Sequence, residues 1–359
     1  MAIIGAGLVG SSLALALRDS GLTLALVDST PLRPDDDATA WDSRVYTINP
    51  GSVEFLHRIG VWERLDGERV TPLYDMRVWG DDGSAEIDFS ALRSAMGELA
   101  WVVENRLLQA VLWEAMGEPE NLHLCRPAGC ADVEWRDDNA VVRLDDGQTL
   151  EVKLVVAADG IESKVRNAAR LPVDTLTYPQ LGVVANFASE RPHRNTAYQW
   201  FRPDGVLAWL PLPGNRVSMV WSASEEVAQQ LLACSTERLA ETVAEAGGGL
   251  LGRFNTITPA ACFPLRWLRS RSVIAPRLAL VGDAAHGVHP LAGQGANLGF
   301  QDTRVLADVL MQRGAQTDCG DYYLLRRYER TRKEAVFAMQ LVTDGLYRLF
   351  SNRDPLIKA

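Results

Sequence analysis

Apolar and polar residues at the start of the chain follow the order strand, turn, helix, strand. In AIIGAGLVGSSLALALRDSGLTLALVD, a short apolar run precedes the glycines, apolar residues from Leu13 to Leu17 recur at helical spacing, and Gly21 closes the expected helix. A second apolar run then ends at Asp28. This pattern predicts a βαβ unit, which implies a parallel sheet with a right-handed crossover.

Further along, the pattern changes between helical and strand periodicity. Residues 52–66 and 104–117 have the spacing of helices, and Ser52 is the expected cap of the first. Residues 73–89 alternate as short strands on either side of a DDGS turn, and residues 140–160 indicate a hairpin that leads into a buried strand. The antiparallel strands are therefore inserted into the βαβ pattern.

The second half of the chain is rich first in strands and then in helices. The expected segments are strands within 180–222, helices at 224–233 and 236–246, a buried strand in RLALVGDAA, a long helix at about 294–312 and other helices beyond 320. The late buried strand and the helix after it repeat the strand–turn–helix pattern of the N-terminal segment.

These segments predict an α/β fold with two domains. One is a discontinuous, Rossmann-like nucleotide-binding domain with a parallel sheet, and the other is a domain with an antiparallel sheet. The first is expected at 1–70, 101–175 and 272–345, the second at 71–100 and 176–271, and 346–359 as the start of a C-terminal helical tail that is cut short.

Composition places the chain among ordinary globular proteins and narrows its partners. Of 359 residues, 47% are hydrophobic and 23% are charged, and the formal charge is −10. That sign disfavours nucleic acid and anionic membranes as general partners, unless a local basic patch exists. The five cysteines are scattered without a C-x-x-C motif, which favours reduced thiols in the cytoplasm. No apolar run is long enough to span a bilayer, and no secretory signal is present.

The first motif with chemical content is GAGLVG, which has Gly5, Gly7 and Gly10 between a strand and a helix. In such a motif the first glycine allows a tight turn, the second lets the backbone approach a pyrophosphate, and the third lets helix and strand pack closely. Asp28 at the end of the next strand would accept hydrogen bonds from a ribose. The motif predicts a dinucleotide, and either a nicotinamide or a flavin would satisfy it.

Two later motifs also place glycines between a buried strand and a helix. In LVVAADGIESKVR, Asp159 and Gly160 follow the strand, and a helix begins near Ser163. In VGDAAHGVHPLAGQGANLGF, Gly282 and Asp283 follow the strand. Before the long helix come Pro290, Gly293, Gly295 and Asn297. A second cradle for an anion or a dipole is therefore expected, in which Asp283 accepts hydrogen bonds from hydroxyl groups.

The histidines of the last motif suggest two other interpretations. Asp283, His286 and His289 have a spacing that occurs among metal ligands, but Gly287 and Pro290 break helical geometry, so we expect no metal. Either histidine could instead act as a general base, or simply pack within the loop. No G-x-S-x-G and no P-loop lysine motif occurs, which excludes the corresponding hydrolases and kinases.

In this order, GAGLVG, AADG and GDAAHGVHPLAGQGANLGF resemble the motifs of the FAD-dependent aromatic hydroxylases, the fold group of p-hydroxybenzoate hydroxylase. Within that group the chain is most similar to the ubiquinone-biosynthesis hydroxylases. The similarity extends to residues 42–65, 103–115 and 207–222 and thus covers nearly the whole chain.

The resemblance implies a role for each matching residue. Gly5, Gly7 and Gly10 would hold the FAD pyrophosphate, and Asp28 the adenosine ribose. Arg44 and Arg106 would contact the cofactor; a surface salt bridge is the alternative for each. Asp159 and Gly160 would shape a groove shared by FAD and NADPH. Gly282 and Asp283 would hold the ribityl chain, and the loop from Pro290 through Gly293 and Gly295 to Asn297 would lie against the flavin ring.

The resemblance also implies an activity. Such enzymes reduce FAD with NADPH or NADH and use O₂ to hydroxylate an aromatic ring, here that of a polyprenylated ubiquinone precursor. No residue can be named as a catalytic base. Trp200, Phe201, Trp209 and Trp221 would wall the substrate pocket or would simply pack in the sheet. The alternatives are a flavin-dependent reductase or dehydrogenase without oxygen insertion, and a scaffold subunit that retains FAD.

The last helical segment allows one more kind of partner. RRYERTRKEAVFAMQLVTDGLYRLF has a basic start and then apolar residues along one helical face. Packing on the nucleotide-binding domain is one interpretation; contact with the inner membrane surface or with a ubiquinone-biosynthesis complex through the C-terminus is the other. The expected location is therefore the cytoplasm, with peripheral membrane contact as the alternative.

Overall fold

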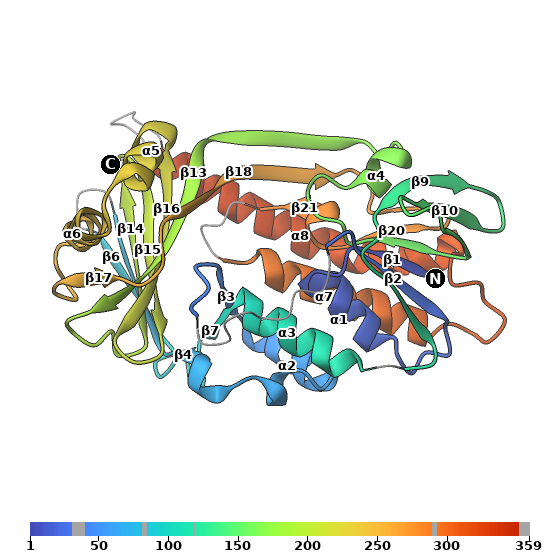
Figure 1. The fold of residues 1–359 in the computed structure, drawn as a ribbon, viewed down its shortest axis with the longest axis horizontal. Helices are drawn as coiled ribbons and strands as arrows, with labels where there is room; N and C mark the ends of the chain where they lie inside the picture. Colours follow the sequence, from blue (N-terminus) through green and yellow to red (C-terminus); the bar gives the residue numbers. More distant parts are fainter. Residues whose placement is uncertain (31–39, 81–84, 118, 289–292, 352–359) are drawn as a thin grey trace.

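A computed structural model describes residues 1–30, 40–80, 85–117, 119–288 and 293–351, the last six of them as backbone alone. The molecule is elongated, and each half is built around its own large sheet (Figure 1). Two long strands and the last helix run from one half to the other. They are β13 (Val173–Ser189), β18 (Ala261–Ser270) and α8 (Tyr322–Ser351).

The first half contains a six-stranded sheet in the order β19-β20-β12-β1-β2-β8. All neighbours from β20 to β8 pair in parallel, and only β19 is antiparallel. Its strands are β1 (Ala2–Ile4), β2 (Leu24–Val27), β8 (Leu122–Cys125), β12 (Val155–Ala157), β19 (Ile274–Ala275) and β20 (Leu278–Leu280). The predicted parallel sheet is confirmed, and it collects strands from three distant parts of the chain.

Both faces of this sheet are covered, which explains why its strands are continuous apolar runs. In β1, Ile3 belongs to the core under the helices, while Ala2 and Ile4 belong to the core on the other face. The first core is formed with α1 (Leu8–Ala16), α2 (Pro50–Arg58), α3 (Asn105–Met116), α7 (Gly295–Met311) and α8. The second is formed with the small sheet of β9 (Cys130–Trp135), β10 (Ala140–Leu144) and β11 (Thr149–Val152) and with α4 (Lys164–Ala168).

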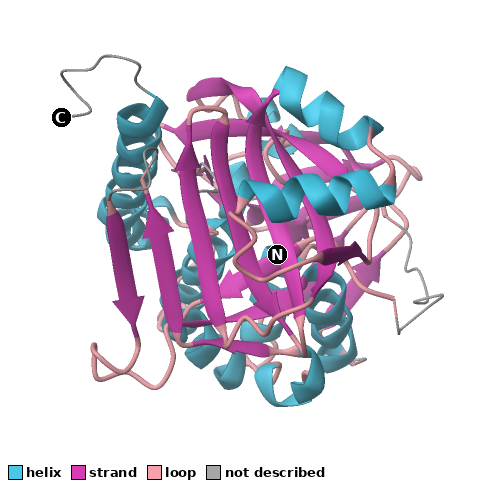
Figure 2. Ribbon diagram, turned by 90° about the vertical axis from the view of Figure 1, so that its left-hand side faces the viewer, coloured by secondary structure: helices cyan, strands magenta, loops and turns pink. Residues whose placement is uncertain are grey.

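The second half contains a nine-stranded sheet, β21-β18-β13-β16-β15-β14-β5-β6, with β17 beside β13. It is antiparallel as predicted, except that β14 and β5 pair in parallel. The remaining strands are β5 (Asp75–Trp79), β6 (Glu86–Ser90), β14 (Thr196–Arg202), β15 (Gly205–Leu212), β16 (Arg216–Ser224), β17 (Phe254–Thr256) and β21 (His286–Gly287). Helices α5 (Glu225–Ala233) and α6 (Thr236–Ala246) cover one face (Figure 2).

The aromatic residues of the second sheet mostly pack beneath α5 and α6. Trp209 and Trp221 are buried in that core, and Phe201 is buried as well. Trp200 is half-buried and stacks on Trp79, with 5.1 Å between the ring centroids. Ordinary sheet packing, the second of the two sequence interpretations, therefore accounts for Trp209, which has no exposed surface.

Several element boundaries differ from the sequence prediction. Asn49, not Ser52, caps α2, because its side chain accepts from the Ser52 amide and Pro50 starts the helix. That helix ends at Arg58, and 3₁₀ turns η1 (Trp62–Arg64) and η2 (Gly67–Arg69) follow. Helix α1 ends at Ala16, so Gly21 lies in the turn beyond it. The predicted DDGS turn lies outside the described residues.

Other differences concern how the two halves join. The helices expected beyond residue 320 are one helix of 30 residues, α8. The predicted domain boundary between residues 175 and 176 falls inside the continuous strand β13. A further small sheet, β3 (Val45–Ile48), β7 (Ala100–Glu104) and β4 (Thr71–Leu73), lies where the halves meet. The exact division into domains stays a prediction.

One buried hydrogen bond ties α8 to the parallel sheet and can be tested. The hydroxyl of Tyr328 donates to the carbonyl oxygen of Leu280 at 2.7 Å, and both residues are buried. Tyr328→Phe leaves that carbonyl without its partner, so we expect the free energy of unfolding to fall by about 1–2 kcal/mol in urea titrations. Tyr323→Phe, at an exposed position of the same helix, is the control and should change nothing. An equal effect of both variants would contradict this role.

Candidate functional site

The first glycine turn joins β1 to α1 and has the shape of a cradle. Gly5 has φ +104°, and a methyl group on it would lie 2.3 Å from the Ala158 carbonyl oxygen. On Gly10 it would lie 1.8 Å from the Gly5 carbonyl oxygen. On Gly7, the N-cap of α1, it would meet no described atom outside its own chain neighbours within 4 Å. The open space therefore lies in front of Gly7, where the first amides of the helix attract an anion.

Asp28 stands beside this turn at the end of β2. Its Oδ2 accepts from the Ala6 amide and its Oδ1 from the Thr30 amide, both at 2.7 Å. The Ala6 carbonyl oxygen in turn accepts from the Gln109 side chain at 3.0 Å. Sequence reasoning missed Gln109, since nothing in its local pattern marks a contact with a turn about a hundred residues away. The carboxylate of Asp28 thus stiffens the loop and is also half-buried at its rim.

The two other glycine motifs reach the same edge of the sheet. Strands β1, β12 and β20 are direct neighbours and run in parallel, so their carboxyl ends place Gly5, Asp159 and Gly282 side by side. Ligands of open α/β sheets bind at such an edge. The sequence predicted each loop separately; the strand order brings them together.

One side-chain oxygen of Asp159 has no described hydrogen-bond partner at this edge. Its Oδ2 accepts from the amides of Lys164 and Val165, at 2.8 and 3.3 Å, at the start of α4. Its Oδ1 is buried and has no hydrogen-bond partner within the described chain. Gly160 follows with φ +80°. A buried acceptor without a partner is costly, and a hydroxyl-bearing ligand would satisfy it.

Asp283 lies in the short turn η3 (Gly282–Ala284) after β20. Its side chain is reached by solvent although protein surrounds it closely, and this desolvation raises its pKa. The charges of His286 and Arg44 act in the opposite direction, and Asp302 adds to the rise. The predicted residues Arg44 and Asp283 are thus close enough to interact, and Tyr46, which stacks under Arg44, interacts with both.

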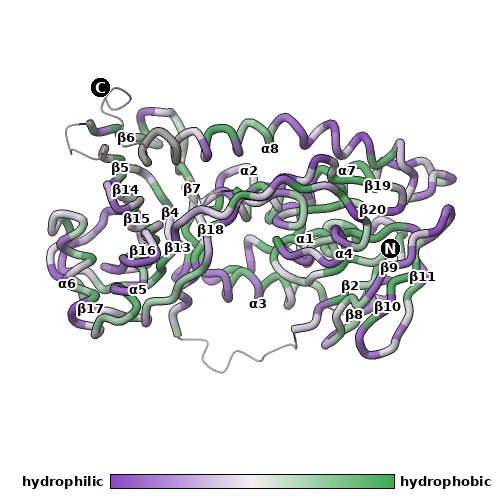
Figure 3. Tube along the Cα trace, turned by 90° about the horizontal axis from the view of Figure 1, so that it is seen from above, coloured by the Kyte–Doolittle hydropathy of each residue, from purple (hydrophilic) through white to green (hydrophobic). Residues whose placement is uncertain are grey.

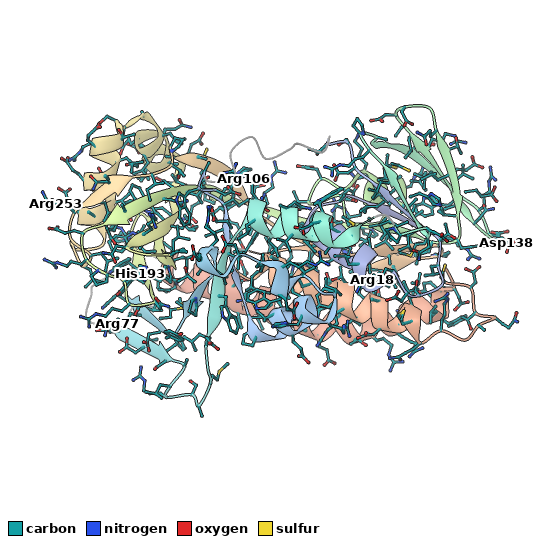
Figure 4. The ribbon with its side chains drawn as sticks, turned by 60° about the horizontal axis from the view of Figure 1, so that its bottom comes forward. Arg18, Arg77, Arg106, Asp138, His193 and Arg253 are labelled. Carbon is teal, nitrogen blue, oxygen red and sulfur yellow. The ribbon has the colours of Figure 1, made fainter. Side chains whose placement is uncertain are left out.

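Arg106 lies in the first turn of α3 and is held there by an acidic partner. Its amide donates to Asp42 Oδ2 at 3.0 Å, and its Nε lies 3.9 Å from the same oxygen. Buried Glu104 accepts from the Asp42 amide at 2.7 Å and pairs with Arg69 at 2.6 Å. Figure 4 shows Arg106 near the middle of the long axis, between the two halves. Asp42, Glu104 and Arg69 therefore fix the loop before β3. No local pattern in the sequence marks these three residues.

The start of α7 is fastened to β3 by Asn297. Its Nδ2 donates to the Thr47 carbonyl oxygen at 2.8 Å, and its Oδ1 accepts from the Asn49 amide at 3.0 Å. Gly293 has φ +58°, and Gly295 begins the helix. Asn297 therefore positions the loop mainly by binding backbone, whereas Pro290 and His289 lie outside the described residues.

A buried charged cluster lies directly behind the Gly282 turn. Asp302 of α7 accepts from the Gly282 amide at 2.9 Å and from His286 Nε2 at 2.6 Å through one oxygen, while its other oxygen pairs with Arg332 Nε at 2.6 Å. Burial alone would lower the pKa of His286, but the Asp302 charge outweighs it and the pKa is raised. His286 is thus buried within the loop and held against Asp302 Oδ2.

At Asp302, burial and the neighbouring charges also act on the pKa in opposite directions, and again the charges dominate. Burial would raise the pKa of Asp302, yet the charges and hydrogen bonds of His286 and Arg332 hold it below its usual value.

Within the described ranges, no group of three metal-ligating side chains occurs. All five cysteines are free thiols.

Two glycine cradles at the carboxyl edge of a covered parallel sheet, with hydroxyl acceptors beside them, define a dinucleotide-binding α/β protein. The chain belongs to the FAD binding domain family, which matches residues 1–343. The site fits FAD on its own evidence, since open space lies in front of Gly7 and the buried acceptor of Asp159 lacks a partner at the same edge.

Related proteins match almost the whole chain. The ubiquinone hydroxylase UbiL of Rhodospirillum rubrum is 38% identical over 98% of this chain and 81% of its own length. The 3-demethoxyubiquinol 3-hydroxylase of Escherichia coli is 34% identical over 100% of this chain and 91% of its own. The FAD-dependent hydroxylase family indicated by the sequence motifs is therefore confirmed.

Solved structures agree on the fold. PqsL of Pseudomonas aeruginosa, a probable FAD-dependent monooxygenase, superposes with a TM-score of 0.78 at 23% identity, over 98% of this chain and 96% of its own. HpxO of Klebsiella pneumoniae, in complex with FAD and uric acid, gives a TM-score of 0.75 at 19% identity, over 99% and 90%. The predicted α/β fold class is confirmed by these similarities.

The open space at Gly7 yields the first test of the site. Gly7→Ala should fold with unchanged stability, because the added methyl group meets no protein atom, but should weaken FAD binding by about tenfold or more, because it stands where a pyrophosphate approaches the backbone. Flavin fluorescence titration of the apoprotein measures this. The control is Gly67→Ala, which also has free space but lies far from the cradle in sequence. Unchanged FAD affinity in Gly7→Ala would place the cofactor elsewhere.

The raised pKa of His286 yields a test on stability. Below the usual histidine pKa of about 6.5, folded and unfolded chains both hold this proton, and the contribution of the ion pair is complete. Above it, only the folded chain holds the proton, so stability falls as pH rises towards the raised pKa of His286. His286→Gln should lose this part of the pH dependence of unfolding, and His123→Gln, at an exposed position, should keep it. Parallel pH profiles for wild type and His286→Gln would contradict the ion pair.

Proposed function

We propose that the chain is an FAD-dependent monooxygenase that hydroxylates the aromatic ring of a polyprenylated ubiquinone precursor, with O₂ and with NADPH or NADH as reductant. The observation that carries the proposal is the similarity over nearly the entire chain to relatives named as ubiquinone hydroxylases. The geometry supports the assignment of the cofactor, because the glycine loops after β1, β12 and β20 lie at one edge of the parallel sheet.

Each loop has a proposed part in holding the cofactor. Gly5, Gly7 and Gly10 would hold the pyrophosphate, with Asp28 at the adenosine ribose. Gly282 and Asp283 would hold the ribityl chain. The segment from Pro290 through Gly293 and Gly295 to Asn297 would lie against the flavin ring, and Arg44 and Arg106 would contact the cofactor.

Asp159 and Gly160 would shape the groove in which FAD and the nicotinamide cofactor meet. The unpartnered Oδ1 of Asp159 supports this assignment, since a ligand hydroxyl is the group that it lacks. Bound FAD supplies the redox chemistry by which an oxygen atom from O₂ reaches the substrate ring. The chain itself binds and orients the cofactor and excludes water.

The reaction needs little acid–base help from the chain. Desolvation raises the pKa of both Tyr46 and Asp283, while the charge of the neighbouring Arg44 opposes the rise at both. These groups serve as hydrogen-bonding groups around the cofactor, and we assign no catalytic base. Arg44 would thereby hold positive charge beside Tyr46 and Asp283, next to the loop that would hold the cofactor.

The proposed substrate has a polyprenyl tail, which partitions into a bilayer. No helix among the described residues is long and apolar enough to cross a membrane. Because of this tail, we propose that the enzyme works from the cytoplasm and reaches its substrate by peripheral contact with the inner membrane surface or with a ubiquinone-biosynthesis complex. Helix α8 is the element that would make this contact.

Oxygen labelling tests the reaction itself. Purified protein should be yellow, oxidise NADPH or NADH in the presence of the precursor, and give a product with one ¹⁸O atom when supplied with ¹⁸O₂. The substrate is the quinone intermediate that accumulates when the gene is deleted from its host. Asp283→Ala, without bound FAD, is the inactive control.

Two outcomes of this experiment would favour another function. A product without ¹⁸O would assign the chain to flavin-dependent reductases or dehydrogenases on the same fold. Bound FAD without turnover of the accumulated intermediate would favour a scaffold subunit that retains FAD for stability.

A further inference from the structure

A pocket of about 290 Å³ lies between the end of β18 and helix α8, behind the Gly282 turn. Basic side chains form much of its rim, and all come from these two segments: Arg269, Arg271, Arg326 and Lys333. Its floor includes His286 and Asp302, which hold the cofactor loop from the other side. The pocket thus differs from the cofactor cradle and shares only its supporting cluster.

Two cations of the rim, Arg269 and Lys333, form no ion pair within the described chain, although the charge of Arg269 also acts on Asp174. Arg271 pairs with Asp174 at 2.9 Å, and Arg326 with Glu329 at 2.7 Å. Lys333 forms no ion pair within the described chain, and Arg269 lies over the ring of Phe337, 4.9 Å from its centroid. These two cations gather at one spot of a protein whose formal charge is −10. Such a local reversal of sign is typical of an anion-binding site.

The acidic groups of the floor do not cancel this charge, because each is already engaged. Asp302 binds Gly282, His286 and Arg332 as described above. One oxygen of Glu329 accepts from the Ser272 hydroxyl at 2.6 Å and from the Val273 amide at 3.2 Å, and its other oxygen pairs with Arg326. Both carboxylates of the floor are thus already bound within the protein, so an anion at the rim meets no unpaired carboxylate there.

An exposed apolar stretch of α8 begins at the wall of this pocket. Phe337 lines the pocket and is 47% exposed, and Leu341 and Val342 in the next turn are 62% and 56% exposed. Helix α8 runs along one long edge of the molecule (Figure 3), so these side chains face outward beside the pocket. The spacing from Lys333 through Phe337 to Leu341 keeps cation and apolar residues on one helical face.

A soluble phosphate would use the cations but not the apolar stretch. An anionic phospholipid at a bilayer surface would use both, since its headgroup phosphate reaches basic side chains while the apolar residues enter the region of the acyl chains. The combination is therefore more specific than either feature alone.

We propose that this pocket binds the headgroup phosphate of an anionic phospholipid and that Phe337, Leu341 and Val342 dock α8 into the membrane interface. The inference deepens the proposed function and rests on it for the reason why the enzyme approaches a bilayer. Because the pocket floor also holds the Gly282 turn, the docked surface lies directly behind the cofactor loop.

Vesicle binding of the FAD-loaded chain tests the proposal. The protein should cosediment with phosphatidylglycerol vesicles and not with phosphatidylcholine vesicles, and binding should weaken as salt is raised. Each basic side chain near an anionic surface contributes about a fivefold gain in affinity, so the double variant Arg269→Gln/Lys333→Gln should bind about 30-fold more weakly. The charge-matched control is Arg327→Gln/Arg330→Gln, on the same helix but outside the pocket, which should retain most of the binding.

The apolar arm uses Phe337→Ala/Leu341→Ala, which should weaken vesicle binding without changing its salt dependence. Leu92→Ala, an exposed leucine beyond β6, is its control. The proposal would be overturned if Arg269→Gln/Lys333→Gln and Arg327→Gln/Arg330→Gln lost vesicle binding equally. Equal binding of the wild type to phosphatidylglycerol and phosphatidylcholine vesicles would overturn it as well. Binding of inorganic pyrophosphate without vesicle binding would make this a soluble-phosphate site and would refute the lipid assignment.

The failure of this inference is distinct from failure of the proposed reaction. Vesicle binding needs no turnover, and FAD absorbance confirms that each variant is folded and loaded. A hydroxylase that ignores vesicles would refute only the docking surface, whereas vesicle binding without ¹⁸O incorporation would refute only the reaction.

Discussion

The buried carboxylate of Asp302 is the constraint on which the rest of the site depends. It joins α7 to the Gly282 turn, to His286 and, through Arg332, to α8. A buried carboxylate is tolerated only when charge and hydrogen bonds compensate it, so these elements are held in one arrangement. That arrangement fixes where Gly282 and Asp283 present themselves to a cofactor. It also forms the floor of the pocket beside α8.

A second constraint comes from strand order. The glycine motifs are separated by more than a hundred residues each, yet β1, β12 and β20 are adjacent and parallel. Their loops therefore open at one edge of the sheet, as long dinucleotides require. Each face of this sheet is buried in its own hydrophobic core. This burial stabilises the short parallel strands β1, β12 and β20 side by side, and so holds their loops together.

The charge of the pocket beside α8 differs in sign from the net charge of the chain. A formal charge of −10 argues against anionic partners for the chain as a whole. Yet Arg269 of β18 and Arg271 just beyond it meet Lys333 and Arg326 of helix α8 around one pocket. Only a local concentration of charge matters at contact distance, because salt screens charges beyond about 8–10 Å. The net negative charge of the chain therefore does not prevent an anion from binding at the basic pocket.

The sequence by itself determined the fold class, the glycine turns and the cofactor family, because these depend on local patterns such as Gly5, Gly7 and Gly10 between a strand and a helix. It misplaced the cap of α2, since Asn49 and Ser52 are both good caps, and Pro50 at the first helical position is the signal that favours Asn49. The tertiary structure alone decided what His286 does, by placing Asp302 against it, and which side chains join in the basic pocket. Such contacts connect residues far apart in the chain, and periodicity contains no information about them.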